Sequence, residues 1–209
     1  MATYGFVHGA WHGGWAWDLV RAELESRGHR VVAPDLPCED VDAGVEEYAA
    51  VVLAELGGVE DAIVVGHSLG GLTIPLVPGR AHVFLCALVA GTGWRDVFVP
   101  AFGDARVRDE LGRSYYPDPV DAARELQYPP ELASLATKLR RQAPVDAEAH
   151  ELHGPVTYVV CASDASVRPE WQRHLARDVL GVEPVELETG HSPMLSRPRE
   201  LAALLDMLS

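Results

Sequence analysis

Short apolar runs alternate with amphipathic stretches along most of the chain, and this alternation limits the folds open to it. The apolar runs indicate β-strands at Tyr4–His8, Arg30–Ala33, Ala62–Gly66, Val83–Val89, Thr157–Cys161 and Pro184–Glu188. Most are aliphatic on both faces, as in strands covered by helices on both sides. Helical patterns span Trp15–Ser26, Val45–Leu56, Leu69–Leu76, Pro169–Leu180 and Arg197–Leu208. We therefore predict an α/β fold with a mostly parallel sheet, in a single domain over residues 1–209.

The alternation is interrupted between about residues 93 and 153, where Asp, Arg, Pro and Tyr are frequent and no buried strand is visible. The pattern there predicts at least one helix, Pro130–Gln142. A structureless loop of this length is unusual in a compact domain. We interpret the segment as an inserted, mainly helical lid; the alternative is a mobile surface excursion.

The charge balance argues against several classes of partner. The net charge is −14, from 31 acidic and 17 basic residues, which disfavours nucleic acid and anionic membrane surfaces. The longest apolar run, Val83–Ala90, is too short to span a bilayer. Lys138 is the only lysine, which leaves one poorly placed candidate for Schiff-base chemistry. We expect no nucleic-acid or membrane partner, and the sequence leaves the oligomeric state open, a homodimer included.

The cysteines and the amino terminus suggest a location. Cys38, Cys86 and Cys161 are odd in number, widely spaced and in no CxxC pair, which suits a reducing compartment and argues against a structural zinc site. The amino terminus has no basic segment leading into an apolar one, so no secretory signal is expected. We expect a cytoplasmic protein without a metal or other cofactor.

The stretch VVGHSLGG, Val64–Gly71, places a serine between two glycines directly after a predicted strand. In one interpretation, Gly66 and Gly70 form an ordinary strand-to-helix turn. In the other, Ser68 stands on a nucleophile elbow, where small residues let the backbone turn tightly enough to present the hydroxyl. GxSxG alone does not decide between the two, because Gly and Ser are common turn residues.

A nucleophilic serine needs a base to take its proton and an acid to orient that base. In open α/β sheets, these groups lie on loops at the carboxyl ends of strands. Asp164 follows the strand Thr157–Cys161, and His191 follows Pro184–Glu188. The chain order Ser, Asp, His is the one expected of hydrolases with this architecture. Asp96 is a rival for the acid, whereas His67, His150, His153 and His174 are interpreted as packing or surface residues.

Negative charge that develops on the substrate needs preorganised N–H donors. One would come from Leu69, after the candidate nucleophile, and the other from Ala10, in the loop FVHGAWHGGW after the first strand. The alternative is a glycine-rich loop anchored by its tryptophans. A metal pair formed by His8 and His12 is disfavoured, because the glycines argue against a helix there.

Four motifs together carry a family resemblance: VHGAWHGGWAW (Val7–Trp17), GHSLGG (Gly66–Gly71), YVVCASD (Tyr158–Asp164) followed by PEWQR, and GHSPMLSRPREL (Gly190–Leu201). With them the chain resembles serine hydrolases of the α/β-hydrolase fold, most closely the branch of plant methyl-ester esterases, hydroxynitrile lyases and their bacterial relatives. The likeness fades across the lid, which is shorter here than in the plant members. The resemblance implies Ser68 as nucleophile, His191 as base, Asp164 as orienting acid, and Ala10 and Leu69 as oxyanion-hole donors.

The same resemblance separates an esterase from a lyase. Hydroxynitrile lyases of this branch carry a threonine after the HG-type turn and a lysine directly after the catalytic histidine. Ala10 and Ser192 occupy these positions here, so cyanohydrin cleavage loses its main electrostatic support. Ser192 also differs from the methionine common in the plant esterases, which puts their aromatic-ester preference in doubt.

The sequence therefore favours hydrolysis of a small carboxylic ester through an acyl-enzyme on Ser68. A thioesterase with the same triad is the first alternative, and a ligand receptor that kept the fold without turnover is the second. We expect Trp11, Trp94 and Phe98 as pocket walls, although each also fits a plain core position.

Overall fold

The computed structural model of the chain describes residues 1–93 and 105–209. At its centre lies a six-stranded sheet in the order β2-β1-β3-β4-β7-β8, in which every neighbouring pair is parallel. The strands are β1 (Thr3–Val7), β2 (Arg30–Val32), β3 (Ile63–His67), β4 (Ala81–Leu85), β7 (Val156–Cys161) and β8 (Val185–Leu187). The predicted mostly parallel sheet is confirmed. Because all six strands run the same way, the loops that follow them meet at one edge.

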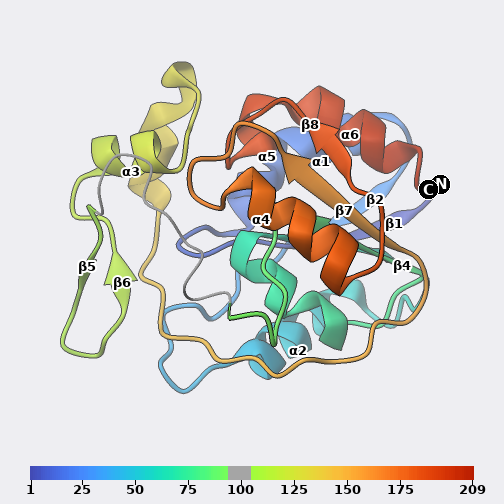
Figure 1. Cartoon of the computed structure of the whole chain (residues 1–209), viewed down its shortest axis with the longest axis horizontal. Helices are drawn as coiled ribbons and strands as arrows, with labels where there is room; N and C mark the ends of the chain where they lie inside the picture. Colours follow the sequence, from blue (N-terminus) through green and yellow to red (C-terminus); the bar gives the residue numbers. More distant parts are fainter. Residues whose placement is uncertain (94–104) are drawn as a thin grey trace.

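Helices cover both faces of the sheet (Figure 1). On one face, α1 (Asp18–Ser26) and α6 (Pro198–Asp206) pack on Ile63 and Val65 of β3; on the other, α2 (Val45–Leu56) and the helical stretch after β7 pack around Val64. Successive side chains of a strand point to opposite faces, so an aliphatic run such as β3 supplies both cores.

Strand β4 begins two residues earlier and ends four residues earlier than the sequence predicts, at Leu85 instead of Val89. Cys86 adopts a left-handed backbone conformation, with φ of +38°, which an extended strand does not allow. Beyond it, the N–H of Leu88 donates to the carbonyl of Ser68 at 2.9 Å. The apolar run therefore leaves the sheet to support the turn that carries Ser68.

The predicted helices exist, but several are tighter or broken. Leu69–Leu76 forms two 3₁₀ helices, η2 (Ser68–Leu72) and η3 (Ile74–Leu76, which contains Pro75), and η1 (Gly14–Trp17) precedes α1. The helix after β7 consists of α4 (Pro169–His174) and a π-helical turn, η6 (Leu175–Val179), and a short α5 (Pro193–Ser196) precedes α6. Proline lacks the N–H of a regular helical turn, which accounts for the break before Pro75.

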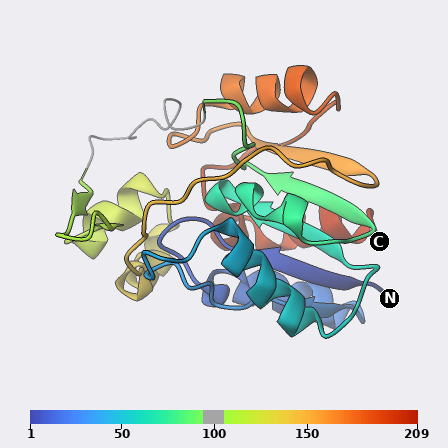
Figure 2. The same ribbon diagram turned by 90° about the horizontal axis from the view of Figure 1, so that it is seen from below.

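The hairpin and the helices that lie between β4 and β7 project at the side opposite to both chain termini, as Figures 1 and 2 show. The described part of this β4–β7 segment contains an antiparallel hairpin of β5 (Val107–Arg108) and β6 (Ser114–Tyr115), followed by α3 (Pro119–Glu125) and the 3₁₀ helix η5 (Pro130–Lys138). The sequence did not predict the hairpin, whose strands are only two residues long. Within residues 1–93 and 105–209, no helix has both the length and the apolar character needed to cross a membrane.

Candidate active site

Ser68 lies at the junction of β3 and η2, in a turn that only small neighbours permit. Its φ is +51°, a left-handed conformation that costs a non-glycine residue roughly 1–3 kcal/mol. A Cβ on Gly70 would lie 2.5 Å from the carbonyl oxygen of Val7, and one on Gly66 would lie 2.8 Å from that of Gly70. Both glycines are therefore required by close backbone approach, and the turn has the geometry of an elbow.

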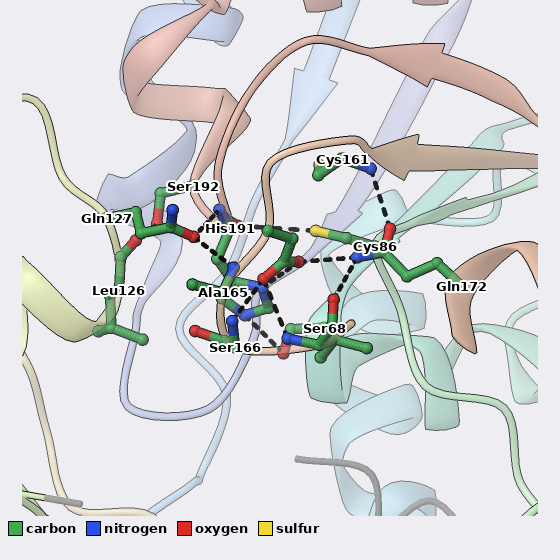
Figure 3. A network of polar contacts seen from close by, with 12 residues as sticks. Ser68, Cys86, Leu126, Gln127, Cys161, Ala165, Ser166, Gln172, His191 and Ser192 are labelled. Atoms are coloured by element: carbon green, nitrogen blue, oxygen red, sulfur yellow. Dashed lines mark hydrogen bonds and ion pairs between the residues drawn. The ribbon is translucent and has the colours of Figure 1, made fainter. Parts of the chain in front are cut away.

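The structure brings Ser68, His191 and Asp164 together, although they lie on three different loops. His191 Nε2 is 3.1 Å from Ser68 Oγ (Figure 3), and His191 Nδ1 is 2.8 Å from Asp164 Oδ2. All three residues are buried. With Nδ1 donating to the carboxylate, Nε2 is left as the acceptor for the serine proton, as a general base requires.

The Asp164 carboxylate is surrounded by hydrogen-bond donors. Oδ1 accepts from the N–H groups of Ser166 and Val167, at 2.7 and 2.9 Å, and Oδ2 accepts from Gln172 Nε2 at 2.9 Å as well as from His191. An ionised carboxylate offers acceptors alone, and each of these contacts is with a donor. The environment is therefore built for a charged acid whose orientation is fixed.

Two glutamines that the sequence patterns did not single out hold this arrangement. Gln172, on α4, is fully buried; its Oε1 accepts from the N–H of Cys161 and its Nε2 donates to Asp164 and to the carbonyl of Val167. The available signal was a polar residue at a position of α4 that faces the sheet. The side chain of Gln127, after α3, forms hydrogen bonds with the loops that carry Asp164 and His191. Nothing in its sequence context distinguishes it from a surface residue.

The loop after β1 is held by two buried histidines. His8 Nδ1 donates to the carbonyl of Gly9 at 2.9 Å, and its Nε2 accepts from the N–H of Leu36 at 3.1 Å. His12 Nδ1 donates to the carbonyl of Ala10 at 2.8 Å, and its Nε2 accepts from the hydroxyl of Tyr128 at 2.8 Å. Both rings use both nitrogens within the protein, so they form no metal pair and serve to shape the loop.

A cavity of about 360 Å³ opens beside Ser68. Ala10 and Leu69, the two predicted oxyanion donors, and Trp11, a predicted pocket wall, contribute to its lining. Leu69 lies in the first turn of η2, where backbone N–H groups have no partner within the helix. The volume falls in the range of small-molecule sites. Trp94 and Phe98, the other predicted walls, and the rival acid Asp96 lie outside the described residues.

The hairpin and the residues before β7 close the cavity on its other side. Arg106, Arg108 and Ser114 line it from the hairpin region, and residues 142–145 contribute a further wall. Trp11 joins the two sides, because its Nε1 donates to Ser114 Oγ at 3.0 Å and its ring lies under the guanidinium of Arg106, 5.4 Å from the ring centroid. The β4–β7 segment therefore helps to form the cavity.

One group of potential metal ligands lies close to the site. Ligand atoms of His67, Cys86 and His191 all fall within 4.8 Å of one another. Both nitrogens of His191 are already engaged by Ser68 and Asp164, and His67 Nε2 donates to the carbonyl of His191. Burial raises the pKa of the Cys86 thiol well above its usual value, so it is neither a ready thiolate ligand nor a rival nucleophile. The cluster is better explained as packing beneath the histidine.

The buried histidines predict an acid-sensitive fold. Burial lowers the pKa of His8 to about 4 and that of His12 to about 3, and it also lowers the pKa of His67 well below the usual value. In the unfolded chain these rings take up protons near pH 6.5, whereas in the folded chain they stay neutral to a lower pH. Their contribution to the free energy of unfolding is therefore fully present above pH 6.5 and is lost as the pH falls towards 4. Between about pH 7.5 and about pH 5.5, we expect the free energy of unfolding to fall by about 4 kcal/mol, roughly 1.4 for each ring.

Urea unfolding at both pH values measures this loss. His174→Gln is the matched control, because the His174 side chain is 43% exposed and its contacts are local: it pairs with Asp178, and its ring lies against that of Trp171 on the same helical stretch. We expect the control to lose as much stability as the wild type. An equal free energy of unfolding at the two pH values would show that the buried rings do not control acid stability.

Comparison with known proteins agrees with the fold and the motifs. A family model described as "Alpha/beta hydrolase family" matches residues 6–204. The "Probable esterase PIR7A" of Oryza sativa subsp. japonica is 32% identical over 246 aligned residues, covering 96% of this chain and 94% of the relative. "Methylesterase 3" of Arabidopsis thaliana is 28% identical, covering 95% and 92%. Since both alignments are longer than the 209 residues of this chain, the relatives carry insertions that it lacks.

Solved structures show the same architecture. A pyrethroid hydrolase from Sphingobium faniae JZ-2 superimposes with a TM-score of 0.81 at 24% identity, over 99% of this chain and 96% of the other. A polyneuridine aldehyde esterase gives a TM-score of 0.81 at 23% identity, over the full length of both chains. At this level of sequence identity, the structural likeness establishes the fold alone.

Proposed function

Because the chain belongs to the alpha/beta hydrolase family, we propose that it is a serine esterase that cleaves small carboxylic esters through an acyl-enzyme on Ser68. The observation that carries this proposal is the continuous hydrogen-bonded chain from Ser68 through His191 to Asp164, at the edge of a cavity of small-molecule size. The curated relatives named above as esterases support the choice of an oxygen ester.

The first half of the reaction forms the acyl-enzyme. Ser68 Oγ attacks the ester carbonyl carbon while His191 Nε2 takes its proton, and the resulting imidazolium is stabilised by the Asp164 carboxylate. The tetrahedral oxyanion accepts hydrogen bonds from the N–H groups of Ala10 and Leu69, which border the cavity with Ser68. When the intermediate collapses, the C–O bond to the alcohol breaks and His191 returns the proton to the leaving oxygen.

The second half releases the acid. Water takes the place of the alcohol, His191 removes a proton from it, and the hydroxide adds to the acyl carbon. The new tetrahedral intermediate uses the same donors, and its collapse breaks the bond to Ser68 Oγ, which recovers its proton from His191. The products are one carboxylic acid and one alcohol for each water consumed, and no cofactor takes part in the proposed steps.

The surroundings of His191 argue against a lyase reaction on this scaffold. Ser192, directly after His191, donates to the carbonyl of Leu126 at 2.7 Å, and Lys138, the only lysine of the chain, lies over the ring of Trp15. The residue directly after His191 is therefore not a lysine whose ammonium group could stabilise a departing cyanide.

The test is a substrate series: p-nitrophenyl esters from acetate to octanoate, beside acyl thioesters of the same chain lengths. We expect kcat/KM to be highest for short oxygen esters, because the cavity of about 360 Å³ accommodates a small acyl group. A clear preference for thioesters would replace the proposal with a thioesterase. No turnover of any substrate by the folded protein would overturn it in favour of a ligand receptor.

A further inference from the structure

A four-residue stretch of the β4–β7 segment, Glu125–Tyr128, contacts three of the four loops that build the site, those after β1, β7 and β8; we call it the clamp. The carbonyl of Glu125 accepts from Ser166 Oγ at 3.0 Å, beside Asp164, and the carbonyl of Leu126 accepts from Ser192 Oγ at 2.7 Å, beside His191. The hydroxyl of Tyr128 donates to His12, which in turn holds the carbonyl of Ala10. These contacts join the clamp to the loops after β7, β8 and β1; Figure 3 shows Leu126 and Gln127 beside the loops of Ser166 and Ser192.

Gln127 makes the most direct connection within the clamp. Its Oε1 accepts from the N–H of Ala165 at 2.8 Å and from the N–H of His191 at 3.0 Å, and its Nε2 donates to the carbonyl of Ser163 at 3.0 Å. One side-chain amide thus joins the backbone on both sides of Asp164 to the backbone of His191 itself. The Nδ1–Oδ2 contact of 2.8 Å between these two residues spans the same two loops.

Two further features indicate that the structure is built around this side chain. Gln127 has a φ of +54°, in the left-handed region where glycine would be relaxed, so the position carries a side chain at an energetic cost. A Cβ on Gly190 would lie 2.7 Å from the Cδ of Gln127, so the residue before His191 must be glycine for the amide to reach both loops. A surface glutamine without a role would need neither arrangement.

We propose that Gln127 is a positioning residue that fixes the separation of Asp164 and His191, an inference that rests on the proposed function of this pair. The β4–β7 segment then does more than line the cavity, because it also orients the proton-transfer groups. The reaction rate depends strongly on this geometry, because a displacement of about 1 Å in a reacting group lowers the rate by up to about 100-fold.

The first test is Gln127→Gly, which suits the positive φ and removes the amide. We expect the variant to keep its fold, with a melting temperature within about 5 °C of the wild type, because relief of the positive φ offsets part of the loss of three hydrogen bonds. We expect kcat for the preferred p-nitrophenyl ester to fall about 10- to 100-fold and KM to change less than about twofold. Thr137→Val is the matched control; it removes a hydrogen bond within η5 to the carbonyl of Ser134 and should leave kcat unchanged. A kcat within twofold of the wild type for Gln127→Gly would overturn the proposal.

The second test, Gln127→Glu, replaces the Nε2 donor to the carbonyl of Ser163 by an oxygen and keeps the acceptor beside His191. A carboxylate can still accept from Ala165 and His191, but it adds a negative charge beside His191 and favours the protonated imidazole. We expect the acid limb of the pH profile of kcat/KM to move upward by about half a pH unit or more. An unchanged profile in this variant overturns the proposal, even where Gln127→Gly is poorly folded. Ser68-independent activity in the wild type would instead overturn the proposed function itself.

Discussion

Ser68→Ala is expected to lower kcat by about 10⁵-fold or more, the largest effect of any single substitution in this chain. Removal of Oγ leaves His191 without a group to deprotonate, and only the N–H donors and the cavity remain to assist direct attack by water. The change is small in volume, and Ala keeps a Cβ in the same left-handed turn. The free energy of unfolding should therefore stay within about 1 kcal/mol of the wild type.

Steady-state hydrolysis of the best p-nitrophenyl ester measures this loss, with urea unfolding as the check on the fold. Ser26→Ala is the control, since Ser26 is an exposed residue at the end of α1 whose hydroxyl donates a hydrogen bond to the carbonyl of Glu23 in the same helix. It should retain full activity. A Ser68→Ala variant with a tenth of the wild-type kcat would exclude Ser68 as the nucleophile.

Asp164→Asn is expected to give the largest loss among substitutions of carboxylates and amides, about 10⁴-fold in kcat. The backbone N–H groups of Ser166 and Val167 keep an oxygen at the Oδ1 position, so the new NH₂ group occupies the Oδ2 position opposite His191 Nδ1. Nδ1 must then accept, and the ring proton moves to Nε2, where it faces Ser68. A ring in that tautomer cannot take the serine proton.

The matched control is Asp178→Asn, which removes the carboxylate of an exposed pair with His174. It should leave kcat unchanged. In Asp164→Asn, KM should change little, because the carboxylate is buried behind His191 and does not line the cavity. A loss of less than tenfold in Asp164→Asn, with the fold intact, would mean that another residue orients the histidine.

The sheet and the Ser68–His191–Asp164 group could be predicted because both follow from short-range patterns. An aliphatic run that is buried on both faces gives a parallel strand, and the residue after such a strand lies at the common edge. Asp164 and His191 each follow a strand by no more than a few residues, so chain order and strand position were enough to bring them towards Ser68.

The parts that escaped prediction depend on contacts between distant residues. The end of β4 is set by the left-handed backbone of Cys86 and by the hydrogen bond from the N–H of Leu88 to the carbonyl of Ser68. Neither feature can be recognised from a run of apolar residues. Gln127 is separated by more than thirty residues from each backbone group that it holds. The hairpin β5–β6 pairs only two residues in each strand, too few for an alternating pattern to emerge.

Three loops from separate strands thus meet at one edge of the sheet, and polar contacts from outside the sheet fix their spacing. Gln172, on α4, orients the carboxylate of Asp164. The clamp, which belongs to the β4–β7 segment, connects the loops that follow β7 and β8. The relatives carry longer chains around the same fold. A short chain that keeps these connections retains the parts that the proposed chemistry needs.

The most direct test of the acyl-enzyme is covalent trapping with a fluorophosphonate ester, followed by intact-mass measurement and peptide mapping. We expect one adduct per chain, located on Ser68, with activity lost in proportion to the fraction modified, and no adduct in Ser68→Ala. An adduct at another residue that tracks the loss of activity, or full activity in protein that is completely modified at Ser68, would rule out Ser68 as the nucleophile.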